Sequence, residues 1–391
     1  MRILVITNLY PNPFQPHRGS FNRQGIRLLA ELHPVMVIAP ISWTDELQAR
    51  RRGAAALPAD RQVELDGVPI VHPRYYFTPR VFRGMYGYSY RASVRRTFRQ
   101  AVATFQPDIV HARWAYPDGW AAVRLGHAAG LPVVTMVHGS DVLLLDQYPR
   151  RRRRTAEALQ KADGVIAVSQ DIARKLPLFG VKQDRILVNY DGVESASFCP
   201  GSKHEARERI GISDGSPIIL FIGGLGQVKG VDVLLRAAAI LARDGFAFRI
   251  VVIGEGPLRS ELERQAQDLG LAGQVRFMGP LPWAELPDWY RAADVFCLPS
   301  HSEGVPNVLL EASACGTPWV ASQVGGIPEI AHLGVSRLVP PNTPPALAAA
   351  LRAALTELIG VRPPGPRDRR AAVAEVSEFL HATLTRVQAR K

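Results

Sequence analysis

The feature that most constrains the fold of this chain is a pattern of short apolar, β-branched runs separated by helical patterns, and this pattern occurs twice. The runs of the first half are residues 3–7, 34–39, 108–112, 132–137, 164–169 and 185–190, and those of the second half are 217–223, 248–254, 274–279, 294–300, 318–322 and 336–340. Strands that are apolar on both faces and alternate with helices are typical of a parallel sheet covered on both sides. The sequence therefore predicts an α/β protein with two Rossmann-like, doubly wound domains.

The division into domains follows from the length and from one polar segment. A chain of 391 residues fits two domains. The turn-rich stretch CPGSKHEAR follows Phe198 and has the composition of a linker, so we expect a first domain over 1–198 and a second over 199–367. Apolar residues at helical spacing predict an amphipathic helix over about 368–391, which can pack back on the first domain. Because ligands of such sheets bind beyond the carboxyl ends of the strands, we expect a deep cleft between the domains to hold the site.

The cysteine content and the apolar runs indicate where in the cell the protein is expected. The three cysteines, Cys199, Cys297 and Cys315, lie far apart without CxxC spacing, so neither a zinc site nor a disulfide framework is indicated. No window approaches the roughly 20 apolar residues of a membrane span, and the first apolar run is too short for a signal peptide. We expect a cytoplasmic protein, or one that is peripheral at the inner face of a membrane.

The net charge of +12 is concentrated in a few arginine-rich stretches. Residues 150–154 are all arginine, and the segment 75–99 mixes arginines with aromatic residues. For the five-arginine run, a solvated surface and a functional surface are equally good interpretations. For the segment 75–99 we predict a surface that meets an anionic membrane. Nucleic acid is not predicted as a partner, because no helix-turn-helix, zinc-finger or RRM signature accompanies the charge.

Two carboxylates in the stretch SEGVPNVLLEASACGTPWVAS need an explanation. Pro306 suits a helix start, and Gly316 with Thr317 and Pro318 suits its end. This short helix would carry Glu311, with Glu303 in the loop before it. A carboxylate is costly to bury without a partner, so a structural ion pair or a hydroxyl-rich ligand such as a ribose would satisfy Glu311. Glu303 could instead simply be favoured by the helix N-terminus.

Two further loops are candidates for binding. Residues 223–230, GGLGQVKG, join a strand to a helix, and such a glycine-rich loop places N–H groups and Lys229 around an anion. A tight turn without a ligand is an equal alternative. The N–H groups of Asn307, Val308 and Leu309 form a second expected anion site. His138 ends a strand in the first half, where a functional side chain and a hydrogen-bonded turn residue are equally good interpretations.

The run EGVPNVLLEASACGTPWVAS, followed by QVGGIPEI, resembles the signature of the retaining GT-B glycosyltransferases of family 4, with Glu303 and Glu311 at the positions of the E-x7-E pair. The resemblance extends over nearly the whole chain through the glycine loop at Gly19, the HGSD turn at His138, FIGGLGQVKGVDVLL and VVIGEGPL. It implies transfer of a sugar, with retention of anomeric configuration, from a nucleotide-diphosphate-sugar to a glycan or lipid-linked acceptor, in cell-envelope polysaccharide or glycolipid synthesis.

The resemblance also assigns roles to residues. Glu303 and His138 are implied to lie against the transferred sugar as the catalytic pair. The residues implied to bind the donor are Gly19, Gly223, Lys229, Gly304, Asn307, Val308 and Glu311. The nucleotide-sugar is a substrate, so no cofactor is implied, and neither is a metal.

One position departs from the family pattern. The family usually has an arginine directly after the glycine that ends the first strand of the second domain, and this arginine commonly holds the diphosphate together with the lysine. Here that position is Gly224. The loss of a bidentate phosphate donor has three interpretations: another arginine substitutes for it in space, the donor differs, or activity is weak or absent. Two alternatives therefore stand beside the transferase: a catalytically silent sugar-nucleotide-binding or scaffold protein that has lost the phosphate contact at Gly224, and, separately, a GT-B phosphorylase.

Overall fold

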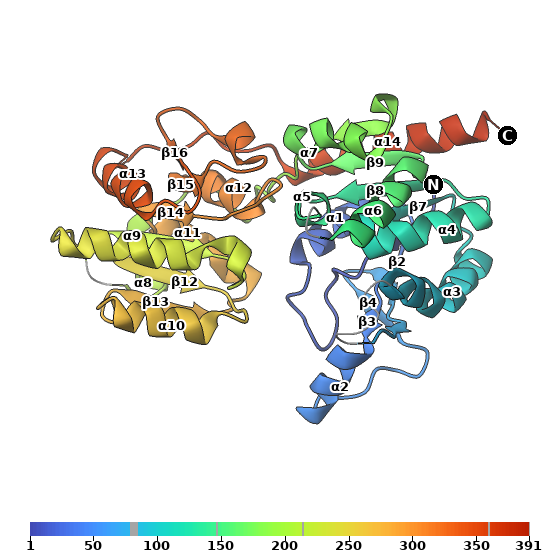
Figure 1. Ribbon diagram of the computed structural model, residues 1–391, viewed down its shortest axis with the longest axis horizontal. Coiled ribbons are helices and arrows are strands. Elements are labelled where there is room, and N and C mark those ends of the chain that lie inside the picture. Colours follow the sequence, from blue (N-terminus) through green and yellow to red (C-terminus); the bar gives the residue numbers. More distant parts are fainter. Residues whose placement is uncertain (79–84, 146–147, 213–214, 359, 391) are drawn as a thin grey trace. The chain divides into compact units, whose positions relative to one another are not determined.

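The computed structural model describes residues 1–78, 85–145, 148–212, 215–358 and 360–390, and the chain forms two compact units (Figure 1). The first unit consists of Met1–Tyr190 and Arg370–Lys391, and the second of Asp191–Arg369. The first stretch therefore ends before the expected boundary at residue 198. The physical reason is that the intervening residues belong to the second unit, where Val193 N–H donates to the Arg367 carbonyl at 3.1 Å and Phe198 is buried in the core.

The first unit is built on a sheet of eight strands in the order β10-β9-β8-β7-β1-β2-β5-β4. Its strands are β1 (Ile3–Ile6), β2 (Val35–Ile38), β4 (Gln62–Leu65), β5 (Val68–Val71), β7 (Ile109–Ala112), β8 (Val133–Val137), β9 (Gly164–Ala167) and β10 (Ile186–Val188). All neighbours pair in parallel except β4 and β5, which form a hairpin. A two-stranded pair, β3 (Ile41–Ser42) with β6 (Arg74–Tyr75), lies outside this sheet. The sheet reverses its strand order between β1 and β7, which is where such sheets bind ligands.

Helices flank this sheet on both faces (Figure 1). They are α1 (Ser20–Leu32), α2 (Trp43–Arg51), α3 (Tyr86–Phe105), α4 (Trp120–Ala128), α5 (Ser140–Leu143), α6 (Pro149–Lys161), α7 (Gln170–Lys175) and α14 (Arg369–Gln388), with short helical turns η2 (Ala115–Gly119), η3 (Leu176–Phe179) and η4 (Gln183–Arg185). The last helix, α14, buries Val373, Val376 and Leu380 in the core of the first unit. The His33 ring and the Ser377 hydroxyl, 2.7 Å apart, connect it to the end of α1.

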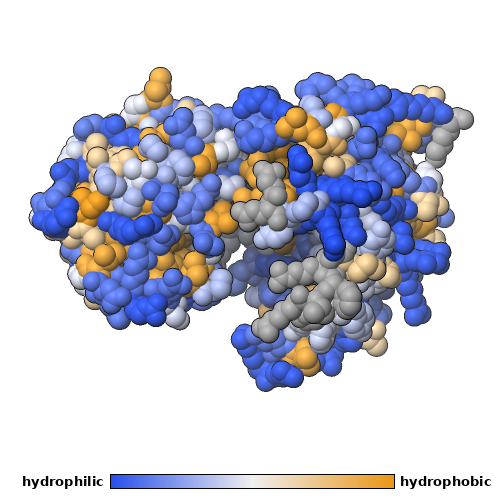
Figure 2. Space-filling model, viewed as in Figure 1, coloured by the Kyte–Doolittle hydropathy of each residue, from blue (hydrophilic) through white to orange (hydrophobic). Residues whose placement is uncertain are grey.

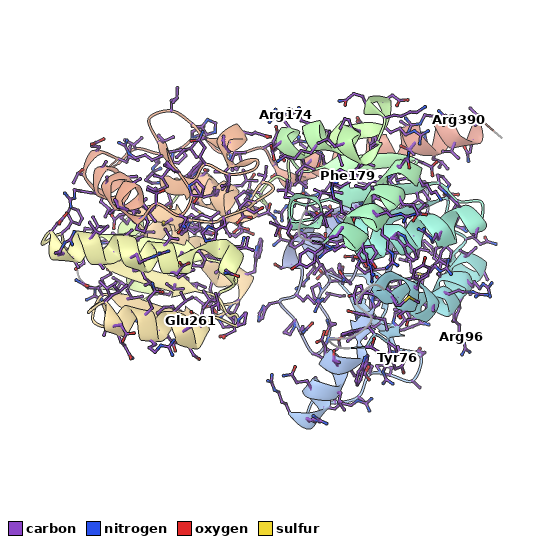
Figure 3. All side chains as sticks on the ribbon, in the orientation of Figure 1. Tyr76, Arg96, Arg174, Phe179, Glu261 and Arg390 are labelled. Atoms are coloured by element: carbon purple, nitrogen blue, oxygen red, sulfur yellow. The ribbon has the colours of Figure 1, made fainter. Side chains whose placement is uncertain are left out.

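Arginines gather on α3 and α6 of the first unit. Arg95, Arg96 and Arg99 are exposed on α3, and Figure 3 shows Arg96 projecting outward. Figure 2 shows strongly hydrophilic side chains gathered over α6, which carries the exposed Arg150, Arg152 and Arg153. We call these six arginines the basic surface. Residues 79–84 of the arginine-aromatic segment, including Phe82, lie outside the described residues.

The second unit has an all-parallel sheet in the order β13-β12-β11-β14-β15-β16. Its strands are β11 (Ile218–Ile222), β12 (Arg249–Ile253), β13 (Val275–Gly279), β14 (Val295–Leu298), β15 (Trp319–Ser322) and β16 (Ser336–Val339). The helices are α8 (Lys203–Arg209), α9 (Val231–Arg243), α10 (Arg259–Asp268), α11 (Leu286–Ala292), α12 (Asn307–Ala314) and α13 (Pro344–Glu357), with turns η5 (Gln227–Lys229), η6 (Trp283–Glu285) and η7 (Ile327–Ile330). This is the doubly wound order of dinucleotide-binding sheets, and it reverses between β11 and β14.

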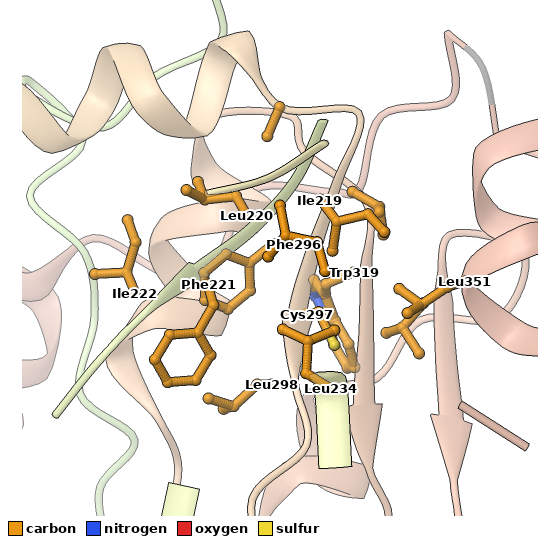
Figure 4. Close-up of a cluster of buried hydrophobic side chains, with 14 of the residues drawn as sticks. Ile219, Leu220, Phe221, Ile222, Leu234, Phe296, Cys297, Leu298, Trp319 and Leu351 are labelled. Carbon is orange, nitrogen blue, oxygen red and sulfur yellow. The ribbon is translucent and has the colours of Figure 1, made fainter. Parts of the chain in front are cut away.

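Large apolar side chains fill the core of the second unit (Figure 4). Phe221 of β11, Phe296 of β14 and Trp319 of β15 are fully buried. The indole N–H of Trp319 donates to the Ser313 hydroxyl at 3.0 Å, so the one polar atom of this ring is satisfied. Truncation of a buried aromatic residue of this kind typically costs about 3–5 kcal/mol. This core fixes the strand ends from which the candidate site is built.

Along the described residues, none of the helices combines the length and apolar character needed to cross a membrane.

Candidate functional site

The glycine-rich loop after β11 packs backbone against backbone on the loops that follow β12 and β14, its two neighbours in the second sheet. A Cβ atom at Gly230 (φ 63°) would lie 2.1 Å from the Pro299 carbonyl oxygen, and one at Gly254 (φ 141°) would lie 1.9 Å from that of Gly223. The Leu225 N–H also donates to the Glu255 carbonyl at 2.9 Å. No side chain fits at these contacts, so the glycine-rich loop after β11 is held in one course at the carboxyl end of the sheet.

Lys229 and Glu303 meet at this edge. The Lys229 Nζ donates to the Glu303 Oε1 at 2.6 Å, and the Ser300 hydroxyl donates to the same oxygen at 2.7 Å. The Glu303 side chain is 11% exposed, whereas that of Lys229 is 30% exposed. The structure therefore brings together two residues that are 74 positions apart in the sequence. Lys229 follows β11 and Glu303 follows β14, the two strands at the reversal point.

The N-terminus of α12 lies directly after this pair. Pro306 caps the helix with an extended backbone, and the first N–H groups of a helix have no partner within it. The expectation for Leu309 is wrong, because its N–H donates to the Pro306 carbonyl at 3.1 Å in a tight first turn. Asn307 and Val308 remain as the candidate amides. The Asn307 Oδ1 is buried and accepts no hydrogen bond from the described residues.

The backbone around Glu303 is itself fixed. The Gly304 carbonyl accepts from the Gly326 N–H at 2.9 Å. A Cβ atom at Gly325 (φ 54°) would lie 1.8 Å from the Glu303 carbonyl oxygen. The GG pair of the QVGGIPEI run therefore serves as a close-packed support for the loop that carries Glu303.

Glu311 is buried in α12 and has a tyrosine as its partner. Glu311 is only 7% exposed. Its Oε2 accepts a hydrogen bond from the Tyr290 hydroxyl at 2.8 Å. Burial raises the pKa of Glu311, while the Tyr290 hydroxyl and the Arg369 guanidinium oppose this rise. Tyr290 was not among the residues expected at the site, because a tyrosine in the run LPDWYRAADV has the spacing of an ordinary core residue.

Gly223 directly follows β11, which ends at Ile222, and Gly224 comes next as an exposed residue. The backbone of Gly224 is outside the left-handed region, and a Cβ atom there would meet no described atom nearer than the Glu255 carbonyl oxygen at 3.9 Å. Space therefore does not explain why this chain has glycine where the family pattern has arginine.

In the first unit, His138 follows β8 and lies between two aromatic rings. The Trp114 ring stacks on it at 5.9 Å with an interplanar angle of 19°, and the Phe21 ring meets it edge-on at 5.1 Å. Burial lowers the pKa of His138 to about 3, so the ring is neutral at pH 7, and a hydrogen bond to the Arg113 carbonyl opposes this shift only in part. Nε2 is buried and has no partner among the described residues. Because Nε2 has no partner, we assign the ring proton to Nδ1, which donates to the Arg113 carbonyl and leaves Nε2 as an acceptor.

Asp141 shapes the HGSD turn. This fully buried carboxylate accepts hydrogen bonds from the N–H groups of His138 at 3.1 Å, Gly139 at 2.9 Å and Ala115 at 3.1 Å. The aspartate of the motif therefore positions the histidine rather than presenting its own oxygens to a ligand.

Gly19 starts α1, two residues before Phe21. It has a left-handed backbone (φ 61°), and a Cβ atom there would lie 2.2 Å from the Leu9 carbonyl oxygen. The Asn22 amide donates to the same carbonyl at 2.8 Å and accepts from the Arg113 guanidinium at 2.7 Å. The structure thus brings Gly19 and His138 together in the first unit. The other predicted residues, Gly223, Lys229, Glu303, Gly304, Asn307, Val308 and Glu311, lie together in the second unit.

Comparisons with known proteins agree with this architecture. Residues 202–359 match the model of "Glycosyl transferases group 1", and residues 23–197 match that of "Glycosyltransferase Family 4". The chain is 31% identical over 366 residues to the "Putative teichuronic acid biosynthesis glycosyltransferase TuaC" of Bacillus subtilis, which covers 90% of this chain and 88% of the relative. It is 35% identical over 296 residues to a "D-inositol 3-phosphate glycosyltransferase" of Acidothermus cellulolyticus, covering 70% of this chain and 64% of that one.

Solved structures share the fold at lower identity. Sucrose-phosphate synthase of Thermosynechococcus elongatus matches with a TM-score of 0.76 at 20% identity, over 99% of this chain and 97% of that chain. HepE of Anabaena, solved in complex with UDP-glucose, matches with a TM-score of 0.72 at 17% identity, over 100% and 99%. The two doubly wound units, the family models and the relatives together show that this chain belongs to glycosyltransferase family 4 and is a transferase of the GT-B fold.

Proposed function

We propose that this glycosyltransferase transfers a hexose or related sugar from a nucleotide-diphosphate-sugar with retention of anomeric configuration, using Glu303 and His138 at the sugar and the second unit for the nucleotide. The observation that carries the proposal is the pairing of Lys229 with Glu303 at 2.6 Å, directly before the helix that holds the buried Glu311. A cation, free helix amides and two carboxylates beside a Rossmann-type reversal point suit a diphosphate and a ribose better than any other common ligand.

In this proposal, the protein neutralises the negative charge of the donor diphosphate. Lys229 leaves Glu303 and turns to the diphosphate, and the N–H groups of Asn307 and Val308 donate to it at the start of α12. Gly223 lets the loop backbone approach the phosphates closely. Glu311 accepts hydrogen bonds from the ribose hydroxyls. The positive charge at the diphosphate therefore comes from Lys229 and from α12.

The proposed step breaks the bond between the anomeric carbon and the phosphate oxygen. A bond forms between that carbon and the acceptor oxygen on the same face of the sugar, and the acceptor's proton passes to the leaving phosphate oxygen. Negative charge grows on the departing diphosphate, where Lys229 and the α12 amides stabilise it. Glu303, released from Lys229, stabilises the positive charge that develops at the anomeric carbon.

His138 supports the sugar in this proposal. The neutral ring has an unpartnered Nε2, which can accept a hydrogen bond from a hydroxyl of the transferred sugar. Its orientation is set by Trp114, Phe21 and the Asp141-bound turn. Gly19, at the start of the helix that carries Phe21, lets the neighbouring loop approach the donor without a side chain in the way.

The test is a panel of UDP-, GDP- and ADP-sugars with membrane extract as the acceptor source, in which nucleotide release is followed. We expect release with one donor by the wild type and by Glu261→Ala, which removes an exposed carboxylate of α10, and loss of release by Glu311→Ala. The anomeric configuration of the product, read by NMR, checks retention. Binding without release for every donor and extract would instead favour a silent subunit, and sugar phosphate release without nucleotide would favour a phosphorylase.

The acceptor is proposed to be anionic or lipid-linked and to lie at the inner face of a membrane. Three apolar residues near α6 are exposed: Leu144 and Tyr148, which precede the helix, and Leu178 of η3, which contacts α6. The guanidinium of Arg154 lies 4.8 Å from the centre of the exposed Tyr88 ring, which joins α6 to the start of α3. Arginines interleaved with protruding apolar side chains suit the headgroup region of an anionic membrane. The names of the two relatives, a putative teichuronic acid biosynthesis glycosyltransferase and a D-inositol 3-phosphate glycosyltransferase, each contain an anionic compound, which agrees with an anionic acceptor.

A further inference from the structure

The contact between Tyr290 and Glu311 has a feature that packing alone does not explain. Tyr290 is fully buried in α11, and its ring packs against Phe198 and Phe296 at centroid distances of 5.9 and 5.5 Å. A phenylalanine would fill the same space. The hydroxyl is the difference, and it donates to the Glu311 Oε2 at 2.8 Å. Among the described residues, no other hydrogen bond is found for this hydroxyl.

Both partners are held in place from outside the contact. The Thr317 hydroxyl donates to the Tyr290 carbonyl at 2.6 Å, which fixes the backbone of α11 behind the ring. Glu311 is on the second turn of α12, whose start is fixed by Pro306. Because the backbone is held on both sides, the Tyr290 hydroxyl occupies one lone pair of Oε2 and restricts rotation of the carboxylate.

The remaining capacity of Glu311 matches a diol. An ionised carboxylate has about four lone-pair positions on two oxygens. With one position on Oε2 taken by Tyr290, the carboxylate can still accept one hydrogen bond at each oxygen. The 2′- and 3′-hydroxyls of a ribose are two neighbouring donors with this spacing. A carboxylate free to rotate would satisfy a single hydroxyl equally well, and it would discriminate less between ribose and deoxyribose.

We propose that Tyr290 is a positioning residue that orients Glu311 for two-point recognition of a ribose, so that the site selects ribonucleotide donors over 2′-deoxyribonucleotide donors. This inference rests on the proposed role of Glu311 as the ribose-binding residue. A merely structural role for Tyr290 would change stability but would leave the preference between the two sugars unaltered.

The test measures binding of UDP, GDP and ADP and of their 2′-deoxy forms to the whole protein by calorimetry. The base that binds most tightly is then compared across the wild type, Tyr290→Phe and Tyr90→Phe. Tyr90 is the matched control, because it is fully buried in the first unit and donates to the buried Asp118 carboxylate in the same manner. Thermal unfolding verifies that each variant is folded.

We expect the wild type and Tyr90→Phe to prefer the ribonucleotide by about tenfold or more, the value of one hydrogen bond to a charged group. In Tyr290→Phe that preference should fall to about threefold or less, through loss of ribonucleotide affinity. An unchanged preference in folded Tyr290→Phe would overturn the inference and leave the proposed function intact. The absence of any preference in the wild type would overturn the role of Glu311 itself.

A second readout separates orientation from packing. The groups that face Glu311 among the described residues are Tyr290, Arg369 and Cys315, and burial raises the pKa of Cys315 to about 12. The pKa of Tyr290 is also raised, well above its usual value of 10, so neither Tyr290 nor Cys315 titrates between pH 5 and 8. Tyr290 acts to lower the pKa of Glu311, so in Tyr290→Phe the protonation of Glu311 moves to higher pH. Ribonucleotide affinity should therefore be lost at a higher pH on acidification than in the wild type, and coincident profiles would contradict the inference.

Discussion

At the scale of single residues, Gly224 is the position of the candidate site at which the arginine of the family pattern can be put back. Gly224 is exposed, its backbone is compatible with any residue, and a side chain there meets open space. The nearby Gly230 has the opposite character, because its left-handed backbone and the Pro299 carbonyl leave no room for a Cβ atom. Two glycines of one loop therefore have different reasons for being glycine.

Replacement of Gly224 by arginine should strengthen donor binding. The guanidinium adds a bidentate, charge-assisted contact to a diphosphate, and we expect nucleoside diphosphate affinity to rise by about tenfold, with stability changed by no more than about 0.5 kcal/mol. Calorimetric titration checks the affinity. Gly224→Gln is the uncharged control and should not reproduce the gain, whereas Gly230→Ala should lower stability. Unchanged affinity in folded Gly224→Arg would show that the diphosphate does not pass this position.

Sequence reasoning located the residues with unusual chemistry but not their supports. Glu303 and Glu311 are carboxylates in an apolar run, and Lys229 is a cation in a glycine-rich loop, so each is visible by type. Tyr290 is not, since a tyrosine within an apolar helix has the signature of a core residue. Its function depends on which atom its hydroxyl meets, and that contact between α11 and α12 is set by tertiary packing alone.

At the scale of elements, the strands that are apolar on both faces were predictable, and the edge of the first sheet was not. Each of the twelve apolar runs contains a strand. The hairpin β4–β5 was not predicted. Its sequence signal is the dipeptide Asp66-Gly67, and both residues have the positive φ that a two-residue Asp-Gly turn requires. The reason is that β4 is an exposed edge strand, so its sequence QVEL carries no apolar run.

The stability that Glu46 of α2 contributes near this edge should depend on pH. Glu46 is 2% exposed and accepts hydrogen bonds from Arg61 and Arg74, which lower its pKa to about 2. Because the folded-state pKa lies below the unfolded value of 4.5, the stabilisation is fully present above pH 4.5 and is lost as the pH falls toward 2.

The variant Glu46→Gln should therefore lower the free energy of unfolding by about 1–3 kcal/mol at pH 7, and its deficit relative to the wild type should shrink between pH 4.5 and pH 2. Urea unfolding at several pH values, followed by a signal from the first unit, measures this. Glu64→Gln, at an exposed position of β4, is the control and should have little effect at any pH. A deficit that is constant with pH would rule out the ion-pair explanation.

At the scale of the whole molecule, charge is distributed so that the first unit presents the basic surface. The net charge of +12 attracts anionic partners in general, but attraction by net charge alone is screened beyond about 8–10 Å at physiological salt. In the membrane proposal, the clustering of arginines on α3 and α6, with exposed apolar residues near α6, distinguishes this surface from one that carries net charge alone.

Replacement of Arg95, Arg96 and Arg99 by glutamate should release the protein from vesicles that contain anionic lipid, as measured by co-sedimentation. The matched control replaces Arg243, Arg264 and Arg276, which are exposed on the second unit, and changes the net charge by the same amount. We expect the control to stay bound. Equal binding of both triple variants would refute the membrane proposal. Equal release would show that vesicle binding depends on net charge and not on the basic surface.

The last helix has a consequence for how the protein is made. Because α14 supplies Val373, Val376, Leu380 and Leu384 to the core of the first unit, that core is incomplete while the ribosome translates residues 191–369. Domains normally fold in order of synthesis, at about 5–20 residues per second. Here the first unit starts to be synthesised before the second unit but is completed after it. For roughly 10–40 s the apolar surface that α14 later covers therefore stays exposed to the chaperones of the cell.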